Sequence, residues 1–352
     1  MYDNFGVDHR TPTYTLSRTP AVSVIIPLYN KVPHIKRALD SVLAQTYQDF
    51  EVIVVNDGST DGSEKTVEEY LDPRIRLVHR VHINSWGGHA ARNLGIAEAR
   101  ADLTAFLDAD DEWLPDYLRT IMSLRSRFPG AAAWSTTYYQ ISRDGIQMEW
   151  EGDVSVVEGD REAGIVDIFA RNARPFCTDS VVIRKATLVS IGGFPEGVAN
   201  GGDLDTWYRL AFRFPIACCL KPEVKYYRNV INPIDVEACM WVGVRPYFAS
   251  LNRFIAESGG QDRVPKEVVD FMMREHYSCY RTNLVAGNRG AARRVACDFM
   301  KMKGFALQGF VQFLATLAPS WLLHLLWRLR RLVKYRTWKL PEMPADVRKI
   351  YP

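Results

Sequence analysis

The stretch Leu103-Thr-Ala-Phe-Leu-Asp-Ala-Asp-Asp-Glu-Trp113 decides the fold. Its uncharged first half leads directly into three aspartates, which predicts a buried strand that ends at the carboxyl edge of a sheet and continues as an acidic loop. Asp108 and Asp110 are separated by Ala109 alone, and a cation or hydrogen-bond donors between them would relieve their repulsion. The pattern predicts a divalent cation that also binds phosphate oxygens. The alternative is that one of these aspartates caps a helix starting near Pro115.

Composition limits the class of protein. The chain has 352 residues, of which 47% are hydrophobic, and this is enough for one large α/β domain with a smaller appendage. The net charge of +3 excludes a molecule that binds nucleic acid over its whole surface. The six cysteines match no zinc-ligand spacing, and we expect free thiols in a reducing compartment. The polar residues 1–20 predict a flexible tail instead of a secretory signal.

Strands and helices alternate after residue 20. Predicted strands at 22–27, 51–56 and 76–79 are each followed by a turn and a helix, the helices covering 32–45, the residues after Gly62, and 89–99. This order predicts parallel βα units, whose ligands bind outside the carboxyl ends of the strands. Asp57 and Asp108 both follow predicted strands, so we expect them in one crevice.

Two further residues have a functional and a structural interpretation. Asp57 can accept the imide N–H of a pyrimidine base, although the turn Asp57-Gly-Ser-Thr-Asp-Gly62 is also a helix-capping sequence. Arg92 lies one turn into a helix preceded by paired glycines, where the backbone can approach a ligand closely. Arg92 therefore either contacts phosphate or base edges, or is an ordinary exposed charge.

Four segments in this order resemble the family 2 inverting glycosyltransferases over about residues 20–215: Val22-Ser-Val-Ile-Ile-Pro-Leu-Tyr-Asn30, Val54-Val-Asn-Asp-Gly-Ser-Thr-Asp61, Ala91-Arg-Asn93 and Phe106-Leu-Asp-Ala-Asp-Asp111. The resemblance implies the GT-A fold, a nucleotide-diphospho-sugar donor such as a UDP-sugar, and Mn²⁺ or Mg²⁺. It implies that Asp57 recognises the base, that Asp108 contacts the ribose and metal-bound water, and that Asp110 binds the metal directly. The remaining implied nucleotide contacts are Pro27, Tyr29, Asn30 and Arg92.

The same resemblance implies a catalytic base. Inversion at an anomeric carbon is a single displacement, in which a carboxylate removes the proton of the acceptor. The family carries a Glu-Asp pair at the start of a helix, after a Gly-Gly-Phe turn. Alignment on Trp207 assigns the base to Asp203, with Asp205 in reserve, but the usual glutamate is Gly202 in this chain. The alternative is that both aspartates only cap the helix.

The chain divides into four predicted parts: a tail (1–20), the catalytic domain (21–232), a helical subdomain (233–303) and a membrane-associating segment (304–352). Residues 131–190 are expected on the acceptor side of the cleft. Their aromatic residues either stack on sugar rings or belong to the core: Trp134, Tyr138, Tyr139 and Trp150. Helices are predicted at 246–258, 265–286 and 289–302.

The C-terminal segment suggests a membrane surface. The uncharged run 304–327 is long enough to span a bilayer, but its polar residues and Pro319 argue against spanning. Residues 320–335 place arginine and lysine on one side of a helix and tryptophan and leucine on the other, which favours docking in the plane of an anionic membrane. Pairing with a helix of another protein is the alternative.

The predicted function is therefore a metal-dependent, non-processive inverting glycosyltransferase at the cytoplasmic membrane face, acting on a glycan or lipid-linked acceptor. A sugar-phosphate nucleotidyltransferase is a rival, but the glycine-rich loop with lysine that it needs is absent after Pro27. A non-catalytic nucleotide-sugar-binding or scaffold protein is a second rival, which Gly202 leaves open.

Overall fold

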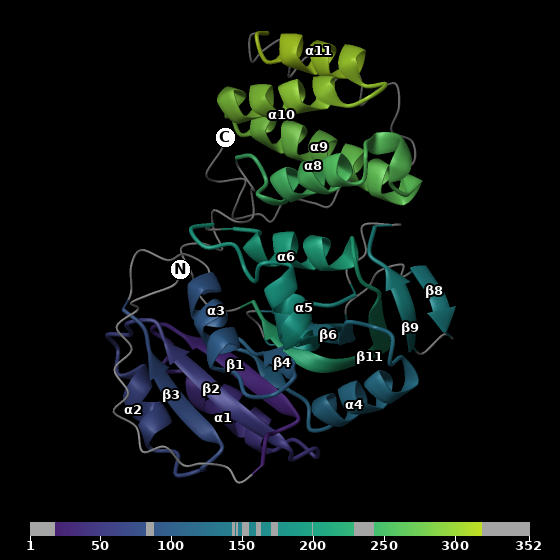
Figure 1. Cartoon of the computed structure of the whole chain (residues 1–352). Coiled ribbons are helices and arrows are strands. Elements are labelled where there is room, and N and C mark those ends of the chain that lie inside the picture. Colours follow the sequence, from purple (N-terminus) through teal and green to yellow (C-terminus); the bar gives the residue numbers. More distant parts are fainter. Residues whose placement is uncertain are drawn as a thin grey trace, which may run out of the picture.

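A computed structural model describes residues 18–81, 88–142, 145, 147–149, 155–159, 163–169, 175–198, 200–228 and 243–318. Its strands form one sheet in the order β3-β2-β1-β4-β10-β6-β11-β9-β8, with β5 added beside β11 and β7 beside β6 (Figure 1). The strands are β1 (Val22–Leu28), β2 (Phe50–Asn56), β3 (Ile75–His79), β4 (Leu103–Phe106), β5 (Glu112–Trp113), β6 (Ala133–Ile141), β7 (Gln147–Glu149), β8 (Ser155–Gly159), β9 (Ala163–Asp167), β10 (Val181–Arg184) and β11 (Ile216–Tyr227).

The first half of the sheet confirms the predicted parallel βα units. β1 pairs in parallel with both β2 and β4, and β2 pairs in parallel with β3. The strands β1, β2 and β4 are buried almost throughout, because helices cover both of their faces. These helices are α1 (Ile35–Leu43), α2 (Ser63–Glu68), α3 (His89–Glu98) and α4 (Tyr117–Arg127). The predicted α/β class, with parallel strands in this part of the sheet, is thereby confirmed.

The second half of the sheet changes direction at β10. This strand runs antiparallel to both of its neighbours, β4 and β6, whereas β6 and β11 are parallel to each other. An antiparallel neighbour starts at the edge where β4 ends. The residues just before β10, which form the short 3₁₀ helix η1 (Thr178–Ser180), therefore lie beside the acidic loop that follows β4.

The C-terminal helices pack onto the α/β part of the chain through aromatic side chains. After α5 (Lys185–Ser190) and α6 (Gly202–Ala211), the chain continues into α8 (Tyr247–Glu257), α9 (Lys266–Val285), α10 (Arg289–Lys301) and α11 (Ala306–Ala315), which stack above α6 in Figure 1. Tyr208 on α6 lies 5.0 Å from the ring of Tyr247 and 4.7 Å from that of Phe271. These rings belong to one continuous hydrophobic core that extends from the sheet into the helices.

Helix α11 is part of this helical group. The hydroxyl of Tyr280 on α9 donates a hydrogen bond of 2.8 Å to the carbonyl of Gln312 on α11, and the predicted boundary at residue 304 falls between α10 and α11. Within the described ranges no helix has the length and apolar character needed to cross a membrane. The predicted basic helix 320–335 and the tail 1–17 lie outside the described residues.

Candidate active site at the carboxyl edge of the sheet

Asp57 occupies the predicted position at the end of β2. Its side chain is buried, its backbone N–H donates a hydrogen bond of 2.8 Å to the carbonyl of Leu28, and its carboxylate forms an ion pair with Arg80. The ends of β1 and β2 are thereby held together. Arg80 follows β3 at the same edge of the sheet, and the sequence analysis did not identify it as a site residue. Its place follows from the parallel register of β2 and β3.

The loop after β1 is tied to the turn after β2. Asn30 adopts a left-handed conformation, with φ of 51°, and its side-chain oxygen accepts a hydrogen bond of 2.8 Å from the backbone N–H of Thr60. Tyr29 remains 48% exposed beside it. Pro27 lies at the carboxyl end of β1, near Gly88. The predicted nucleotide-contacting residues are therefore grouped at one edge, with an exposed aromatic ring.

Asp110 pairs with a lysine. Its carboxylate lies 2.7 Å from the ammonium group of Lys31, and both side chains are largely buried. Lys31 was not identified from the sequence, because a single lysine after a strand carries no distinctive pattern. The assignment of Asp110 as the direct metal ligand stays a prediction. A ligand role would require Asp110 to share or release its lysine partner.

A second group of carboxylates gathers next to it. One carboxylate oxygen from each of Asp108, Asp111 and Asp179 lies within 4.8 Å of the others. Asp179 accepts a hydrogen bond of 2.6 Å from the backbone N–H of Asp108, and Asp111 accepts one of 2.7 Å from that of Tyr227. Asp111 adjoins the predicted pair in sequence. Asp179 lies within the segment 131–190 that was expected to line the cleft, but no role at the metal was predicted for it.

The electrostatics of this group suit a cation. Burial, together with Asp108, raises the pKa of Asp179 to about 7. Burial and the neighbouring Asp179 raise the pKa of Asp111 well above its ordinary value. Three buried or half-buried carboxylates that repel one another supply the oxygen ligands that Mg²⁺ and Mn²⁺ prefer. The residues therefore fit a divalent metal ion, and the identity of the metal is not fixed by this donor set.

Arg92 is a buried ion-pair partner. Its guanidinium group forms an ion pair with Asp108 from the first turns of α3, which rules out the interpretation as an ordinary exposed helix charge. Burial alone would lower the pKa of Arg92, but the neighbouring Asp108 outweighs it and raises the pKa, with Asp179 and Asp203 acting in the same direction. The side chain of the adjacent Asn93 accepts a hydrogen bond of 2.8 Å from the backbone N–H of Phe194 and donates one of 2.9 Å to the carbonyl of the same residue.

Helix α6 presents Asp203. Asn93 fixes the Gly-Gly-Phe turn that precedes this helix, and Asp203 lies in its first turn, half-buried. Within the described part of the chain the Asp203 carboxylate makes no hydrogen bond or ion pair. The reserve candidate Asp205 is buried and bonded to Arg209 at 2.7 Å. Asp203 is therefore the more available of the two carboxylates, and its role as the base stays a prediction.

The predicted aromatic residues on the acceptor side divide into two groups. Trp134 is fully buried and donates a hydrogen bond of 3.1 Å to the carbonyl of Phe128, so it belongs to the core. Tyr138 is partly exposed and packs edge-to-face on Tyr226 at 6.3 Å. Trp150 lies outside the described residues.

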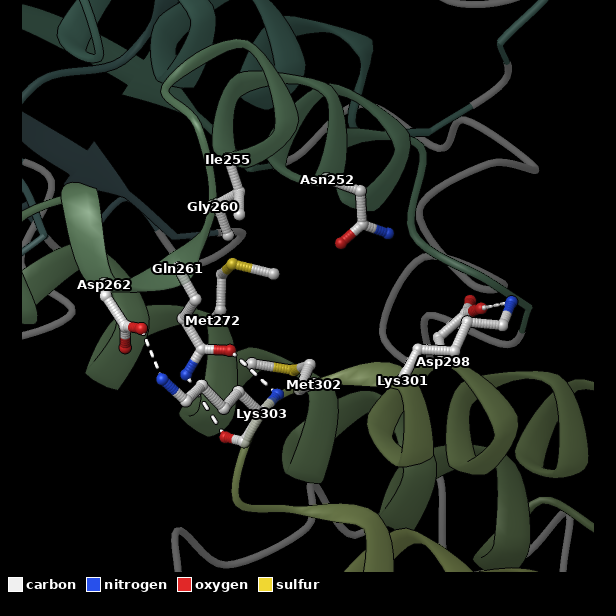
Figure 2. A pocket seen from close by; sticks show the side chains of 10 residues that line it. All are labelled: Asn252, Ile255, Gly260, Gln261, Asp262, Met272, Asp298, Lys301, Met302 and Lys303. Carbon is white, nitrogen blue, oxygen red and sulfur yellow. Dashed lines mark hydrogen bonds and ion pairs between the residues drawn. The ribbon is translucent and has the colours of Figure 1, made fainter.

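A separate cavity of about 490 Å³ lies among the C-terminal helices, floored by Met272 and Met302 (Figure 2). Its charged rim is already paired, because Lys303 bonds Asp262 and Lys301 bonds Asp298 at 2.9 Å. None of the predicted site residues lines it. We therefore do not assign this cavity as the active site.

Comparison with known proteins assigns part of the chain to a family. The sequence profile of Glycosyl transferase family 2 matches residues 23–170. Residues 23–170 are a family 2 glycosyltransferase domain. Apart from Val22, the four segments on which the resemblance was based lie within this range, and the helix with Asp203 follows it.

Relatives of this glycosyltransferase domain occur in bacteria and archaea. The chain is 39% identical over 111 residues to the uncharacterized glycosyltransferase YibD of Escherichia coli, and this covers 31% of each protein. It is 35% identical over 198 residues to an uncharacterized glycosyltransferase of Rickettsia felis, covering 54% of this chain and 30% of the relative. It is 28% identical to glycosyltransferase AglE of Haloferax volcanii, covering 58% of this chain and 67% of AglE. The chain thus spans about a third of the length of the first two relatives.

Solved structures show the same fold. The crystal structure of S. aureus TarS 1–349 in complex with UDP-GlcNAc superimposes with a TM-score of 0.61 at 16% identity, covering 84% of this chain and 88% of the TarS chain. The complex with UDP gives 0.61 at 17% identity, covering 91% of this chain and 94% of the other. The glycosyltransferase domain therefore has the GT-A fold of TarS.

Proposed function

We propose that this protein is a metal-dependent, inverting and non-processive glycosyltransferase that uses a UDP-sugar. The observation that carries the proposal is that carboxylates from three separate regions act on one buried arginine. Asp108, Asp179 and Asp203 each raise the pKa of Arg92. The ion pair of Arg92 with Asp108, and the hydrogen bond from the backbone of Asp108 to Asp179, support one shared site for the acidic loop after β4, η1 and the start of α6.

The nucleotide would bind at the ends of β1 and β2. Asp57 accepts hydrogen bonds there and Tyr29 offers an exposed ring on which a base can stack. The TarS complexes contain UDP and UDP-GlcNAc on the same fold, which supports a uridine nucleotide as the donor. Arg92, held by Asp108, is available to orient the diphosphate or ribose.

The metal would be held by Asp108 together with Asp111 and Asp179, or with Asp110 once Lys31 moves away. When bound, Mn²⁺ or Mg²⁺ neutralises negative charge on the diphosphate. Asp111 and Asp179, whose pKa values are raised by burial and by neighbouring carboxylates, are expected to lose their protons on binding a cation.

The transfer step assigns the base to Asp203. An acceptor hydroxyl oxygen forms a bond to the anomeric carbon while the bond from that carbon to the diphosphate oxygen breaks. Asp203 accepts the hydroxyl proton, and the nucleoside diphosphate leaves with the electron pair. Because the Asp203 carboxylate makes no hydrogen bond or ion pair among the described residues, it can accept that proton.

The acceptor is proposed to be a glycan or lipid-linked saccharide at the cytoplasmic face of a membrane. Helix α11 and the residues just after it leave a row of large apolar side chains exposed: Leu307, Phe310, Val311, Leu314 and Leu317. The basic sequence 320–335 follows directly. An apolar row next to a basic segment matches the chemistry of an anionic lipid surface.

The test of the enzymatic proposal is a donor panel. The purified chain is incubated with UDP-, GDP- and dTDP-sugars in the presence of Mn²⁺, Mg²⁺ or EDTA, and release of nucleoside diphosphate is measured. We expect turnover of a UDP-sugar that depends on the metal. A protein that binds UDP but turns over no donor, with or without acceptor glycans, would be the non-catalytic rival.

A further inference from the structure

His89 fills the space of a missing side chain beside the proposed base. It is the first residue of α3, is 4% exposed, and stacks on Phe194 with ring centroids 5.9 Å apart. A Cβ atom built on Gly202 would lie 2.5 Å from the Nε2 atom of His89. The imidazole and any side chain at position 202 therefore exclude each other.

This packing concerns position 202, where the chain has glycine and the family motif has the glutamate that precedes the catalytic base. The motif that Asp203 matches carries an acidic residue at the preceding position, and this chain has Gly202 there. The volume of that side chain is occupied by an imidazole from a different helix. Where the resemblance implies an acidic neighbour for the base, this chain therefore places an imidazole.

The surroundings of His89 favour its neutral form. Burial, together with the nearby Arg92, lowers the pKa of His89 to about 4, although Asp203 and Asp108 act in the opposite direction. A neutral imidazole has one N–H donor and one acceptor nitrogen. The Nδ1 atom is buried without a hydrogen-bond partner among the described residues. Such an atom is costly in a folded protein unless it gains a partner at some stage.

The Nε2 atom of His89 lies against Gly202, the residue before Asp203, and the imidazole interacts electrostatically with the Asp203 carboxylate, which makes no hydrogen bond or ion pair among the described residues. We propose that His89 is a positioning residue for Asp203, whose imidazole N–H donates a hydrogen bond to the carboxylate and orients it toward the acceptor hydroxyl. This inference rests on the proposed function. Hydrogen bonds of this kind often tighten only when substrate is bound.

A neutral donor suits this task. A cationic neighbour would stabilise the ionised carboxylate and make it a weaker base, whereas a neutral N–H fixes its direction at a smaller cost in basicity. An acidic neighbour would compete for the same proton. His89 therefore supplies orientation, and Asp203 alone accepts the proton.

The first test uses His89→Phe, which keeps an aromatic ring against Phe194 and removes both nitrogens. We expect kcat for sugar transfer to fall by about 10-fold or more, with the donor KM and the melting temperature close to those of the wild type. His89→Gln, which restores an N–H donor, is expected to recover most of the lost kcat. An unchanged kcat in His89→Phe would overturn the proposal.

The second test separates positioning from packing. Gly202→Ala is expected to displace the imidazole, which lowers both the melting temperature and kcat. The double variant His89→Ala/Gly202→Ala removes the overlap, so its melting temperature should recover while kcat stays low. Recovery of both quantities would show that His89 only fills space, and this result remains decisive if His89→Phe does not fold.

These outcomes are distinct from failure of the proposed function. If the wild-type chain transfers sugar and His89→Phe transfers it equally well, the role of His89 is refuted and the proposed glycosyltransferase activity stands. A wild-type chain that binds UDP in calorimetry but transfers no sugar refutes the enzymatic proposal, and the positioning role with it.

Discussion

Asp179 accepts a hydrogen bond of 2.6 Å from the backbone N–H of Asp108, although 71 residues separate them in the chain. The contact exists because β10 runs antiparallel to β4, so that the start of one strand meets the end of the other. The same region holds Trp113, whose indole N–H donates to the carbonyl of Asp179 at 2.7 Å. The acidic loop is thereby fixed against a residue that the motif itself does not contain.

The stability of the metal-free protein should decrease as pH rises. Because the pKa values of Asp179 and Asp111 are raised in the folded state, the folded chain binds more protons than the unfolded chain between their ordinary pKa and about 7. Unfolding therefore becomes easier as pH increases through that range. Melting temperatures measured in EDTA across the range check this, with Asp179→Asn as the variant in which the slope should flatten.

Divalent cations should reverse this trend. Binding requires ionised carboxylates, so Mn²⁺ is expected to raise the melting temperature more at about pH 8 than at about pH 5. Equal increases at both values would show that the cation does not bind to Asp111 and Asp179.

Asp203→Asn should abolish transfer and preserve donor binding. The amide keeps the size of the side chain but cannot accept the hydroxyl proton, and we expect a loss in kcat of about 10²-fold or more. Binding of UDP, measured by calorimetry, should stay unchanged. Asp205→Asn is the matched comparison, and because Asp205 bonds Arg209, its main effect should be on melting temperature. The reverse pattern would transfer the base role to Asp205.

Asp57→Ala should weaken UDP binding by about 10-fold or more, since a hydrogen bond to a charged group would be lost. Discrimination between UDP and CDP should also fall, because uracil offers an imide N–H and cytosine does not. Asp72→Ala is the control, as Asp72 also pairs with an arginine, Arg74, in the same half of the sheet. Equal affinity losses in the two variants would indicate a general structural effect.

Gly95→Ala should destabilise the protein. A Cβ atom at this position of α3 would overlap the side chain of Ile25 on β1, closer than real Cβ contacts allow. Overpacking of this kind lowers the free energy of unfolding by about 1–3 kcal/mol. The better helix propensity of alanine offsets about 1 kcal/mol of this loss. Urea unfolding measures the difference. Gly130→Ala is the control, because no atom lies within 4 Å of its added Cβ.

Replacing Leu307, Phe310 and Leu314 together by serine should reduce binding to anionic vesicles. These side chains form part of the exposed row on α11, and burial of apolar area drives docking of such a helix. Sedimentation with phosphatidylglycerol vesicles measures the bound fraction. Leu71→Ser, at a leucine that is 94% exposed near β3, should leave binding unchanged. Unchanged sedimentation of the triple variant would remove α11 from the membrane proposal.

The sequence by itself determined the parallel βα units and the edge at which the site lies. Alternation of apolar strands with helices is a local pattern, and ligands collect at the carboxyl ends of such strands. The positions of Asp57 and Asp108 follow from this pattern alone. Family resemblance added the roles of Asp203 and Asp110, which stay predictions.

Only the tertiary structure decided which groups are partners. Lys31 beside Asp110, Arg92 beside Asp108 and Asp179 beside Asp111 depend on the order and direction of the strands, in particular on the antiparallel β10. The fit of His89 against Gly202 likewise joins two helices far apart in sequence. Side-chain contacts of this kind carry no periodic signal along the chain, because they arise when separate elements pack together.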